Sequence, residues 1–224
     1  VFIGDYHATT YPKWAPDGGR VVIPYGLPED FCQADPLSEP LPPRAVFTSN
    51  PLRSLDWLLE LWAESIQPWV AGAELHVFAG AATYGSVGAD KEAAMEKVLD
   101  RARALQGQGV KLRGPVPKAR LIQELRQSRA MLYRGDLNET FCLAVGEAQA
   151  MGVPAVVEKL GSVSERVIDG ETGFVAAGAA AFAEAAKRLL TDDDLWRAQH
   201  LAAIEKQRQW RCADAAAAFE KLIP

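Results

Sequence analysis

Cysteine and histidine are scarce in this 224-residue sequence, and their placement argues against several kinds of site. The three cysteines are far apart and fit no disulfide or metal-binding spacing: Cys32, Cys142 and Cys212. The three histidines are equally isolated: His7, His76 and His200. We therefore predict no metal site, reduced thiols and a cytoplasmic location.

Long apolar runs and an excess of positive charge are also lacking. No stretch approaches 18 uninterrupted apolar residues, so no transmembrane helix is predicted, and the first residues do not resemble a signal peptide. Lys and Arg number 24 against 29 Asp and Glu, and a net charge of −5 argues against a nucleic-acid partner. The 49% of hydrophobic residues is typical of a globular chain with a buried core.

Several nucleotide-binding and catalytic signatures are missing. The sequence has no G-x-G-x-x-G after a strand, no G-x4-G-K-[ST] loop and no Ser/His/Asp order. Interpretations as a dehydrogenase or a nucleoside triphosphatase are therefore weakened.

An alternation of short apolar runs and helical segments begins near Ala45. Buried strands are expected at residues 45–49, 74–79, 110–112, 130–133, 153–157 and 173–176. Helical periodicity separates most of them, a polar loop is expected at 81–89, and the chain from 179 to 223 is expected to be helical with a break near 192–194. This alternation predicts an α/β fold with a doubly wound parallel sheet.

The residues before this alternation follow no such rhythm. Short apolar, strand-like runs occupy 1–3 and 20–25, and five prolines follow between 28 and 43. The proline-rich part has no helical period and is interpreted as a linker.

One stretch organises the second half of the chain: ETFCLAVGEAQAMGVP, residues 139–154. It is expected to be helical and to end at Gly152. Glu139 and Glu147 would lie about 12 Å apart if both were helical, which is about the length of a sugar diphosphate plus a ribose. The free N–H groups and positive dipole end of a helix also suit a diphosphate. On spacing alone, Glu139 could instead be an acidic first-turn residue and Glu147 a solvated one.

The same stretch resembles the donor-site signature of retaining glycosyltransferases with the GT-B fold, typically EGFG…EAMAAG.P. The matching residues are Glu139, Phe141, Glu147, Ala148, Ala150, Gly152 and Pro154. Thr140 and Cys142 depart from it, because they replace two glycines. The resemblance implies a Rossmann-like domain, the C-terminal half of a GT-B fold. It also implies transfer of a sugar from a nucleoside diphosphate sugar to a glycan, lipid or protein acceptor with retention, and neither a bound metal nor a cofactor.

The resemblance also assigns roles to individual residues. Glu139 would hold sugar hydroxyls and Arg53 would clamp the diphosphate with its planar fork of donors. Glu147 would meet the ribose. The remaining substrate-binding candidates are Thr140, Phe141, Cys142, Asn50, Gly114 and Val116.

Some of these assignments have plain alternatives. Arg53 could be an exposed arginine at a helix start, and Gly114 could serve only a tight turn. Asn50 would take the place of a first arginine in the family pattern. Arg134 stands where the family often has proline, and its role is left open.

By resemblance, residues 1–43 are the remnant of a preceding domain and a linker. Residues 44–205 form the nucleotide-sugar-binding domain, and 206–224 a C-terminal helix. The chain alone would then be catalytically incomplete, and peripheral membrane contact would run through the missing domain. The alternatives are an N-terminal arm of a complete protein, a sugar-nucleotide epimerase of the same fold, and a non-catalytic nucleotide-binding or scaffold module.

Overall fold

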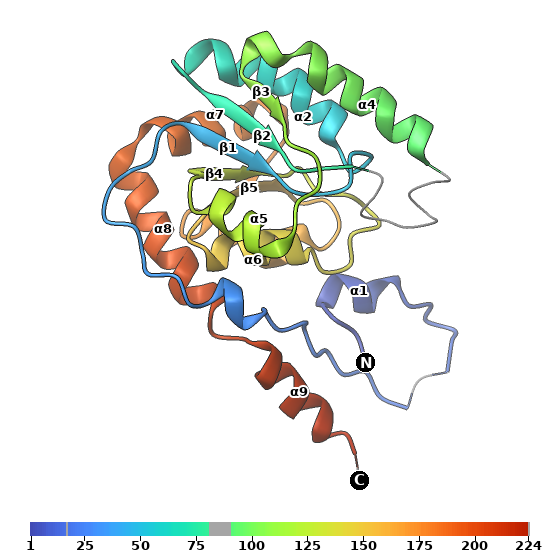
Figure 1. The fold of residues 1–224 in the computed structure, drawn as a ribbon. Coiled ribbons are helices and arrows are strands. Elements are labelled where there is room, and N and C mark those ends of the chain that lie inside the picture. The colour runs from blue at the N-terminus through green and yellow to red at the C-terminus, as the bar shows by residue number, and fades with distance from the viewer. Residues whose placement is uncertain (17, 81–90, 224) are drawn as a thin grey trace.

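A single parallel sheet of six strands forms the centre of the molecule (Figure 1). The computed structural model describes residues 1–16, 18–80 and 91–223. In spatial order the strands are β3 (Val110–Leu112), β2 (Glu74–Val77), β1 (Arg44–Phe47), β4 (Ala130–Leu132), β5 (Ala155–Glu158) and β6 (Gly173–Ala176). All five neighbouring pairs are parallel. The predicted doubly wound parallel α/β fold is confirmed.

The strands are apolar runs because the sheet is covered on both faces. All three residues of β4 are buried, as are the last three of β1. In the register at the centre, Val46 of β1 lies between His76 of β2 and Met131 of β4. The central strands β1 and β4 are therefore buried in the hydrophobic core, and loops and polar groups lie where the strands begin and end.

Helices cover both faces of the sheet. They are α2 (Leu55–Leu61), α4 (Glu92–Ala104), α5 (Lys118–Leu125), α6 (Leu143–Ala150) and α7 (Ala179–Thr191). Two more helices follow near the end of the chain, α8 (Asp193–Gln207) and α9 (Cys212–Glu220), and α9 projects away from the sheet (Figure 1). Figure 1 shows α2 and α4 on one side of the sheet and α5 and α6 on the other, with α8 packed along α6 and α7. The Asp192 carboxylate caps α8 by accepting the Leu195 N–H at 3.0 Å, and the predicted break near 192–194 is confirmed.

Short helical turns connect several of these elements. Two follow α2 directly: η2 (Trp62–Ile66), a π-helical turn, and η3 (Gln67–Trp69). The others are η5 (Gln106–Gln108) before β3 and η6 (Val163–Arg166) after β5. The loop expected at 81–89 lies outside the described residues.

The N-terminal segment differs from its sequence-based prediction. The strand-like runs at 1–3 and 20–25 form no strand, only an isolated bridge between Phe2 and Val22. An unpredicted helix, α1 (Asp5–Thr10), lies between them, and a 3₁₀ turn, η1 (Glu29–Phe31), interrupts the proline-rich segment. The residues of α1 are weak helix formers, so tertiary contacts described below decide its conformation.

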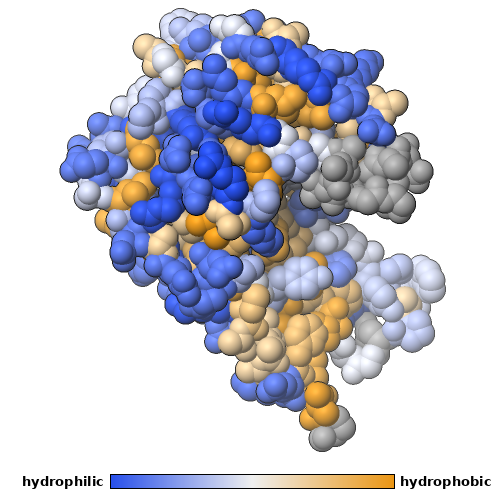
Figure 2. Space-filling view, in the orientation of Figure 1, coloured by the Kyte–Doolittle hydropathy of each residue, from blue (hydrophilic) through white to orange (hydrophobic). Residues whose placement is uncertain are grey.

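Exposed apolar residues gather over the lower part of the molecule in Figure 2, where α9 lies. In α9 and directly after it, Phe219, Leu222 and Ile223 are exposed. Within the described residues, no helix is both long and apolar enough to cross a membrane.

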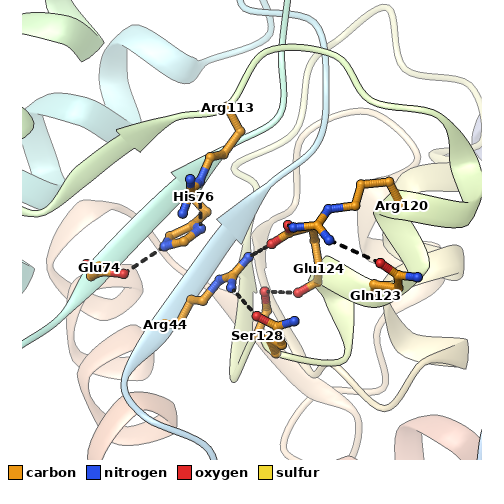
Figure 3. Close-up of polar contacts among 9 residues, drawn as sticks. Arg44, Glu74, His76, Arg113, Arg120, Gln123, Glu124 and Ser128 are labelled. Carbon is orange, nitrogen blue, oxygen red and sulfur yellow. Dashed lines mark hydrogen bonds and ion pairs between the residues drawn. The ribbon is translucent and has the colours of Figure 1, made fainter.

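A polar cluster occupies the edge of the sheet where β1 and β2 begin (Figure 3). Buried Glu124 accepts from Arg44 at the start of β1 and from Arg120, the latter at 2.5 Å. Beside it, buried His76 contacts the Glu74 carboxylate through Nε2 at 2.8 Å and accepts from Arg113 at Nδ1 at 3.4 Å. His76 is therefore a neutral imidazole with its proton on Nε2, donating to Glu74.

Burial lowers the pKa of His76 despite the carboxylate of Glu74. The pKa of Glu74 is also lowered, chiefly by the hydrogen bond from His76, and a neutral donating imidazole accounts for both directions. A second buried histidine, His200, accepts from the Leu37 N–H at 2.9 Å and contacts the Gly152 carbonyl at 2.5 Å. Burial lowers its pKa as well.

We predict that stability falls as the pH drops from about 7 to about 5. A histidine whose pKa is lower in the folded than in the unfolded state, near 6.5, binds more protons when unfolded, so acid favours unfolding. Each histidine should contribute about 1.4 kcal/mol per unit of lowering. Urea unfolding at pH 7.5 and 5.5 measures the difference, which should shrink in His76→Gln and in His200→Gln. An equal fall with pH in the double variant would contradict this origin.

Candidate functional site

The loops that follow β1 and β4 meet at the carboxyl edge of the sheet. These strands are neighbours, and the winding direction reverses between them, which is where open α/β sheets place their ligands. Arg53, after β1, forms an ion pair with Glu139, after β4. The structure thus joins the two predicted catalytic residues, which are 86 positions apart in sequence.

The Glu139 carboxylate is held by two further donors. One oxygen, Oε2, accepts from Arg53 and from the Tyr133 hydroxyl at 3.1 Å, and Oε1 accepts from the Cys142 backbone N–H at 3.2 Å. The Glu139 side chain is 12% exposed, whereas that of Arg53 is 35% exposed. The carboxylate is therefore fixed, and the guanidinium is its more accessible partner.

The surroundings set the charges of this group. Burial is the largest single influence on Arg53 and opposes its charge, but Glu139, Tyr133 and Asp136 together outweigh it and raise the pKa of Arg53. Burial raises the pKa of Tyr133 and that of the Cys142 thiol. Both side chains are neutral at physiological pH, so Tyr133 acts as a donor and Cys142 is not a reactive thiolate.

Two non-glycine residues at the site have left-handed backbones. Ser54 (φ 62°) precedes α2 and Cys142 (φ 60°) precedes α6, and they are the two such residues in the described ranges. Ser54 occupies the N-cap position of α2, but its hydroxyl donates to the Gly135 carbonyl at 2.9 Å instead of capping the helix. Non-glycine left-handed residues cost of order 1–3 kcal/mol and cluster at functional sites.

The helix of the central stretch begins later than predicted. It starts at Leu143, so Glu139 lies in the preceding loop, and the separation of about 12 Å along one helix axis does not apply. The reason is the left-handed Cys142, which prevents the helix from extending back to Glu139. Cys142 thus adopts a conformation that glycine reaches without strain, whereas Thr140 does not have a positive φ.

Phe141 and Thr140 differ in their surroundings. Phe141 is buried between the Tyr25 ring, at 5.2 Å between centroids, and the Arg166 guanidinium, 4.3 Å above the ring. Thr140 is half-buried, and within the described residues its side chain makes no hydrogen bond. Phe141 therefore supports the loop from behind, and a contact to a ligand stays a prediction for both.

Glu147 is buried on α6, which excludes the alternative of a solvated helix residue. Its Oε1 accepts from Lys118 Nζ at 2.6 Å, and Lys118 is 61% exposed. This ion pair ties the start of α5 to α6. Sequence reasoning did not assign Lys118 to the site.

The turn that carries the substrate-binding candidates Gly114 and Val116 lines hollows at the same edge of the sheet. Val116 borders a cavity of about 120 Å³ with Thr48, Ser49, Phe78, Pro115 and other residues. Gly114 (φ 68°) borders the neighbouring hollow instead. The side-chain oxygen of Asn50 accepts from the Leu52 N–H within its own turn, at 2.9 Å, and a contact of Asn50 to a ligand stays a prediction.

The open question of Arg134 has a structural answer. Its Nε donates to Glu158 at 2.9 Å, and its guanidinium lies 4.7 Å from the centroid of the Trp57 ring. These contacts fix the loop after β4 to β5 and α2. Within the described residues, no cluster of three or more His, Cys, Asp or Glu side chains could hold a metal.

The N-terminal segment packs on the same loops. The Tyr6 hydroxyl of α1 donates to the Leu137 carbonyl at 2.8 Å, and the Tyr6 N–H donates to Glu165 Oε1 at 2.5 Å. Glu165 lies in η6, at the N-terminus of α1 where a carboxylate is favourable. These contacts hold α1, which local propensity does not favour.

Comparison with known proteins agrees with this geometry. Residues 43–192 match the family described as Glycosyl transferases group 1. The chain belongs to this family. It is 31% identical to the D-inositol 3-phosphate glycosyltransferase of Corynebacterium diphtheriae over 133 residues, which are 58% of this chain and 31% of that protein. A counterpart from Corynebacterium aurimucosum is 31% identical over 50% of this chain and 27% of its own length.

Solved structures of glycosyltransferases share the fold. The sucrose-phosphate synthase of Thermosynechococcus elongatus superposes with a TM-score of 0.77 at 19% identity, over 99% of this chain and 56% of that one. Anabaena HepE in complex with UDP and glucose superposes with a TM-score of 0.71 at 16% identity, over 92% and 58%. This group 1 glycosyltransferase chain thus spans about a third of the curated relatives above and little more than half of these structures.

Tyr133 is the site residue that sequence reasoning missed. It is fully buried just after β4, so its run of apolar neighbours gave no signal beyond core packing. The path of the loop after β4 returns Glu139 to the Tyr133 hydroxyl, six residues earlier in the sequence. Lys118 had a weak signal, because it belongs to a local basic group in the sequence.

The loop after β4 packs directly on the loop after β5. The Ser162 N–H donates to the Glu139 carbonyl at 2.9 Å. A Cβ at Gly161 (φ 68°) would lie 2.0 Å from the Asp136 carbonyl oxygen. This close approach of two backbones sets the position of Glu139.

We predict that Gly161→Ala is far more damaging than Gly114→Ala. Both glycines have a φ of 68°, so alanine pays the same left-handed penalty of about 1–2 kcal/mol at each. At position 161 the added methyl group would also collide with backbone atoms of the neighbouring loop. At position 114 no atom lies within 4 Å of it. Urea unfolding should show a loss of about 1 kcal/mol for Gly114→Ala and a loss larger by 2 kcal/mol or more for Gly161→Ala. Equal losses would show that the two loops separate without cost.

Proposed function

We propose that this chain is the donor-binding part of a glycosyltransferase that transfers a sugar from a nucleoside diphosphate sugar with retention of anomeric configuration. Family membership supports the general activity. The complexes of fold neighbours with UDP, such as that of Anabaena HepE, support the donor class. The acceptor, a glycan, lipid or protein, would bind with the help of residues beyond this chain, which spans 31% of its C. diphtheriae relative.

The observation that carries this proposal is the Arg53–Glu139 pair at the reversal point of the sheet. It places a cation with a planar fork of donors beside a fixed carboxylate, close to the N-terminus of α6. A diphosphate needs donors and positive charge, and sugar hydroxyls need an acceptor. One site therefore offers complementary groups to both parts of a nucleoside diphosphate sugar.

The proposed chemistry is electrostatic. Arg53 would turn from Glu139 to the diphosphate and stabilise the negative charge that develops on it as the bond to the sugar breaks. Glu139 would accept hydrogen bonds from sugar hydroxyls while Tyr133 and the Cys142 N–H keep it aligned. The ribose would lie at Glu147 and the base near Val116. Free Cys32 and Cys142, both buried, support placement in the reducing cytoplasm.

We predict that Arg53→Ala weakens the binding of nucleoside diphosphates by about 10- to 100-fold and leaves the affinity for the matching nucleosides unchanged. Hydrogen bonds to charged groups contribute about 1.5–3 kcal/mol, and only the diphosphate would use this one. Calorimetry with UDP, GDP and ADP, each against its nucleoside, measures the difference. Arg53→Lys should recover part of the affinity, because lysine keeps the charge without the fork.

Arg101→Ala is the matched control for this measurement. Arg101 also pairs with a carboxylate, Asp56 at 2.6 Å, but on the surface of α4. Equal losses for nucleoside and diphosphate in Arg53→Ala would point to a disturbed fold and refute the clamp. If the wild-type chain binds none of the three diphosphates, the scaffold alternative is favoured.

A different pattern is expected for Glu147. We predict that Glu147→Gln weakens the binding of nucleosides and of nucleoside diphosphates alike, by about tenfold or more, because the ribose is common to both. Lys118→Met removes the partner of Glu147 without touching the ribose acceptor, so its affinities should match the wild type. The same calorimetric series measures both variants. Unchanged nucleoside affinity in Glu147→Gln would exclude the ribose role and assign Glu147 to the ion pair alone.

A further inference from the structure

A second cavity, of about 170 Å³, is lined by none of the residues proposed to bind the donor, although Tyr25 and Arg166 in its lining pack on Phe141. It is formed by the N-terminal segment, η6 and the end of α8, and its lining includes Pro24, Tyr25, Arg166, Lys206, Gln207 and Trp210. Hydrogen bonds hold its walls together. Trp210 donates to the Pro24 carbonyl at 3.0 Å, and Gln207 donates to the Arg166 carbonyl at 3.0 Å. We refer to it as the Arg166 pocket.

Within the described residues, the Arg166 side chain is held by neither an ion pair nor a hydrogen bond, and its Nε is enclosed without a partner. Its one neighbour of note is the Phe141 ring, 4.3 Å from the guanidinium. Burial lowers the pKa of Arg166, and the charge of the neighbouring Glu165 offsets this only in part. A half-buried cation that forms no ion pair or hydrogen bond is costly to the fold, and a role in binding an anion explains it.

The second cation of the pocket is only loosely engaged. Lys206 Nζ lies 3.4 Å from both Glu171 and Glu205, whose side chains are 46% and 69% exposed. Such solvent-exposed pairs contribute little energy. Lys206 can therefore turn to an anion in the pocket at small cost.

We propose that the Arg166 pocket binds a phosphate group, either as the free ion or as a phosphomonoester on a molecule other than the sugar donor. The guanidinium fork and the Lys206 ammonium would supply charge-assisted hydrogen bonds. Tyr25 and Trp210 would form the apolar side of the pocket. The site is distinct from Arg53 and does not depend on the proposed donor function.

The test is a titration of the ¹⁵N-labelled chain with sodium phosphate at pH 7.5, with sodium chloride keeping the ionic strength constant. The reporter is the Trp210 indole N–H resonance, identified by its loss in Trp210→Phe. We expect a saturable shift that becomes at least about tenfold weaker in Arg166→Met, because a charge-assisted contact is lost while the stem still packs on Phe141. Lys206→Met should weaken binding about two- to fivefold, and Arg166→Lys should fall between wild type and Arg166→Met.

Two controls separate this pocket from other cations. Arg188 lies over the Phe174 ring at 5.2 Å much as Arg166 lies over Phe141, so Arg188→Met removes a stacked arginine elsewhere and should not change phosphate binding. Arg53→Ala should not change it either, whatever its effect on nucleotides. Glycerol 3-phosphate distinguishes the sources: tighter binding than phosphate indicates a phosphomonoester, and weaker binding the free ion. No saturable shift, or an equal shift in a folded Arg166→Met or Arg166→Lys, overturns the proposal.

Discussion

The ion pair between Arg53 and Glu139 joins the two halves of the sheet at the point where the winding direction reverses. It exists because β1 and β4 are neighbours in space although two strands separate them in sequence. Each partner follows a strand whose carboxyl end opens at the same edge. The order of the strands therefore brings the guanidinium of Arg53 and the carboxylate of Glu139 together. Neither residue is brought to the other by its local sequence.

The same edge is where the backbone is strained. Ser54 and Cys142 have left-handed conformations directly after Arg53 and close after Glu139, and each is held by its surroundings. The Ser54 hydroxyl reaches the Gly135 carbonyl, and the Cys142 N–H reaches the Glu139 carboxylate. Strain of this kind persists only where neighbouring contacts over-determine it. Here those contacts tie both helix starts to the loop that carries Glu139.

Sequence reasoning predicted the fold and the family because periodicity and a spaced motif are local signals. The order of the strands and the meeting of Arg53 with Glu139 depend on how distant segments pack. The donor Tyr133 is only six residues from Glu139, but its role depends on the path of the loop between them, which no motif in the sequence specifies. The helix start was misplaced at Glu139 because a left-handed cysteine has no sequence signal of its own. In the same way, α1 was missed because its contacts with Leu137 and Glu165 lie far along the chain.

The geometry also explains how one carboxylate could serve a dianionic ligand. Without a cation beside it, the Glu139 carboxylate would repel a diphosphate. Arg53 would therefore have to move from Glu139 to the diphosphate while Glu139 itself stays in place. Breaking a buried pair outright costs about 3–5 kcal/mol, but here the Tyr133 hydroxyl and the Cys142 N–H stay in place. On the proposed function, Arg53 gains a partner of higher charge and Glu139 gains sugar hydroxyls as donors. A nucleoside has neither a diphosphate for Arg53 nor a transferable sugar for Glu139. The preference of this site for a nucleoside diphosphate sugar over a nucleoside would therefore depend on both groups.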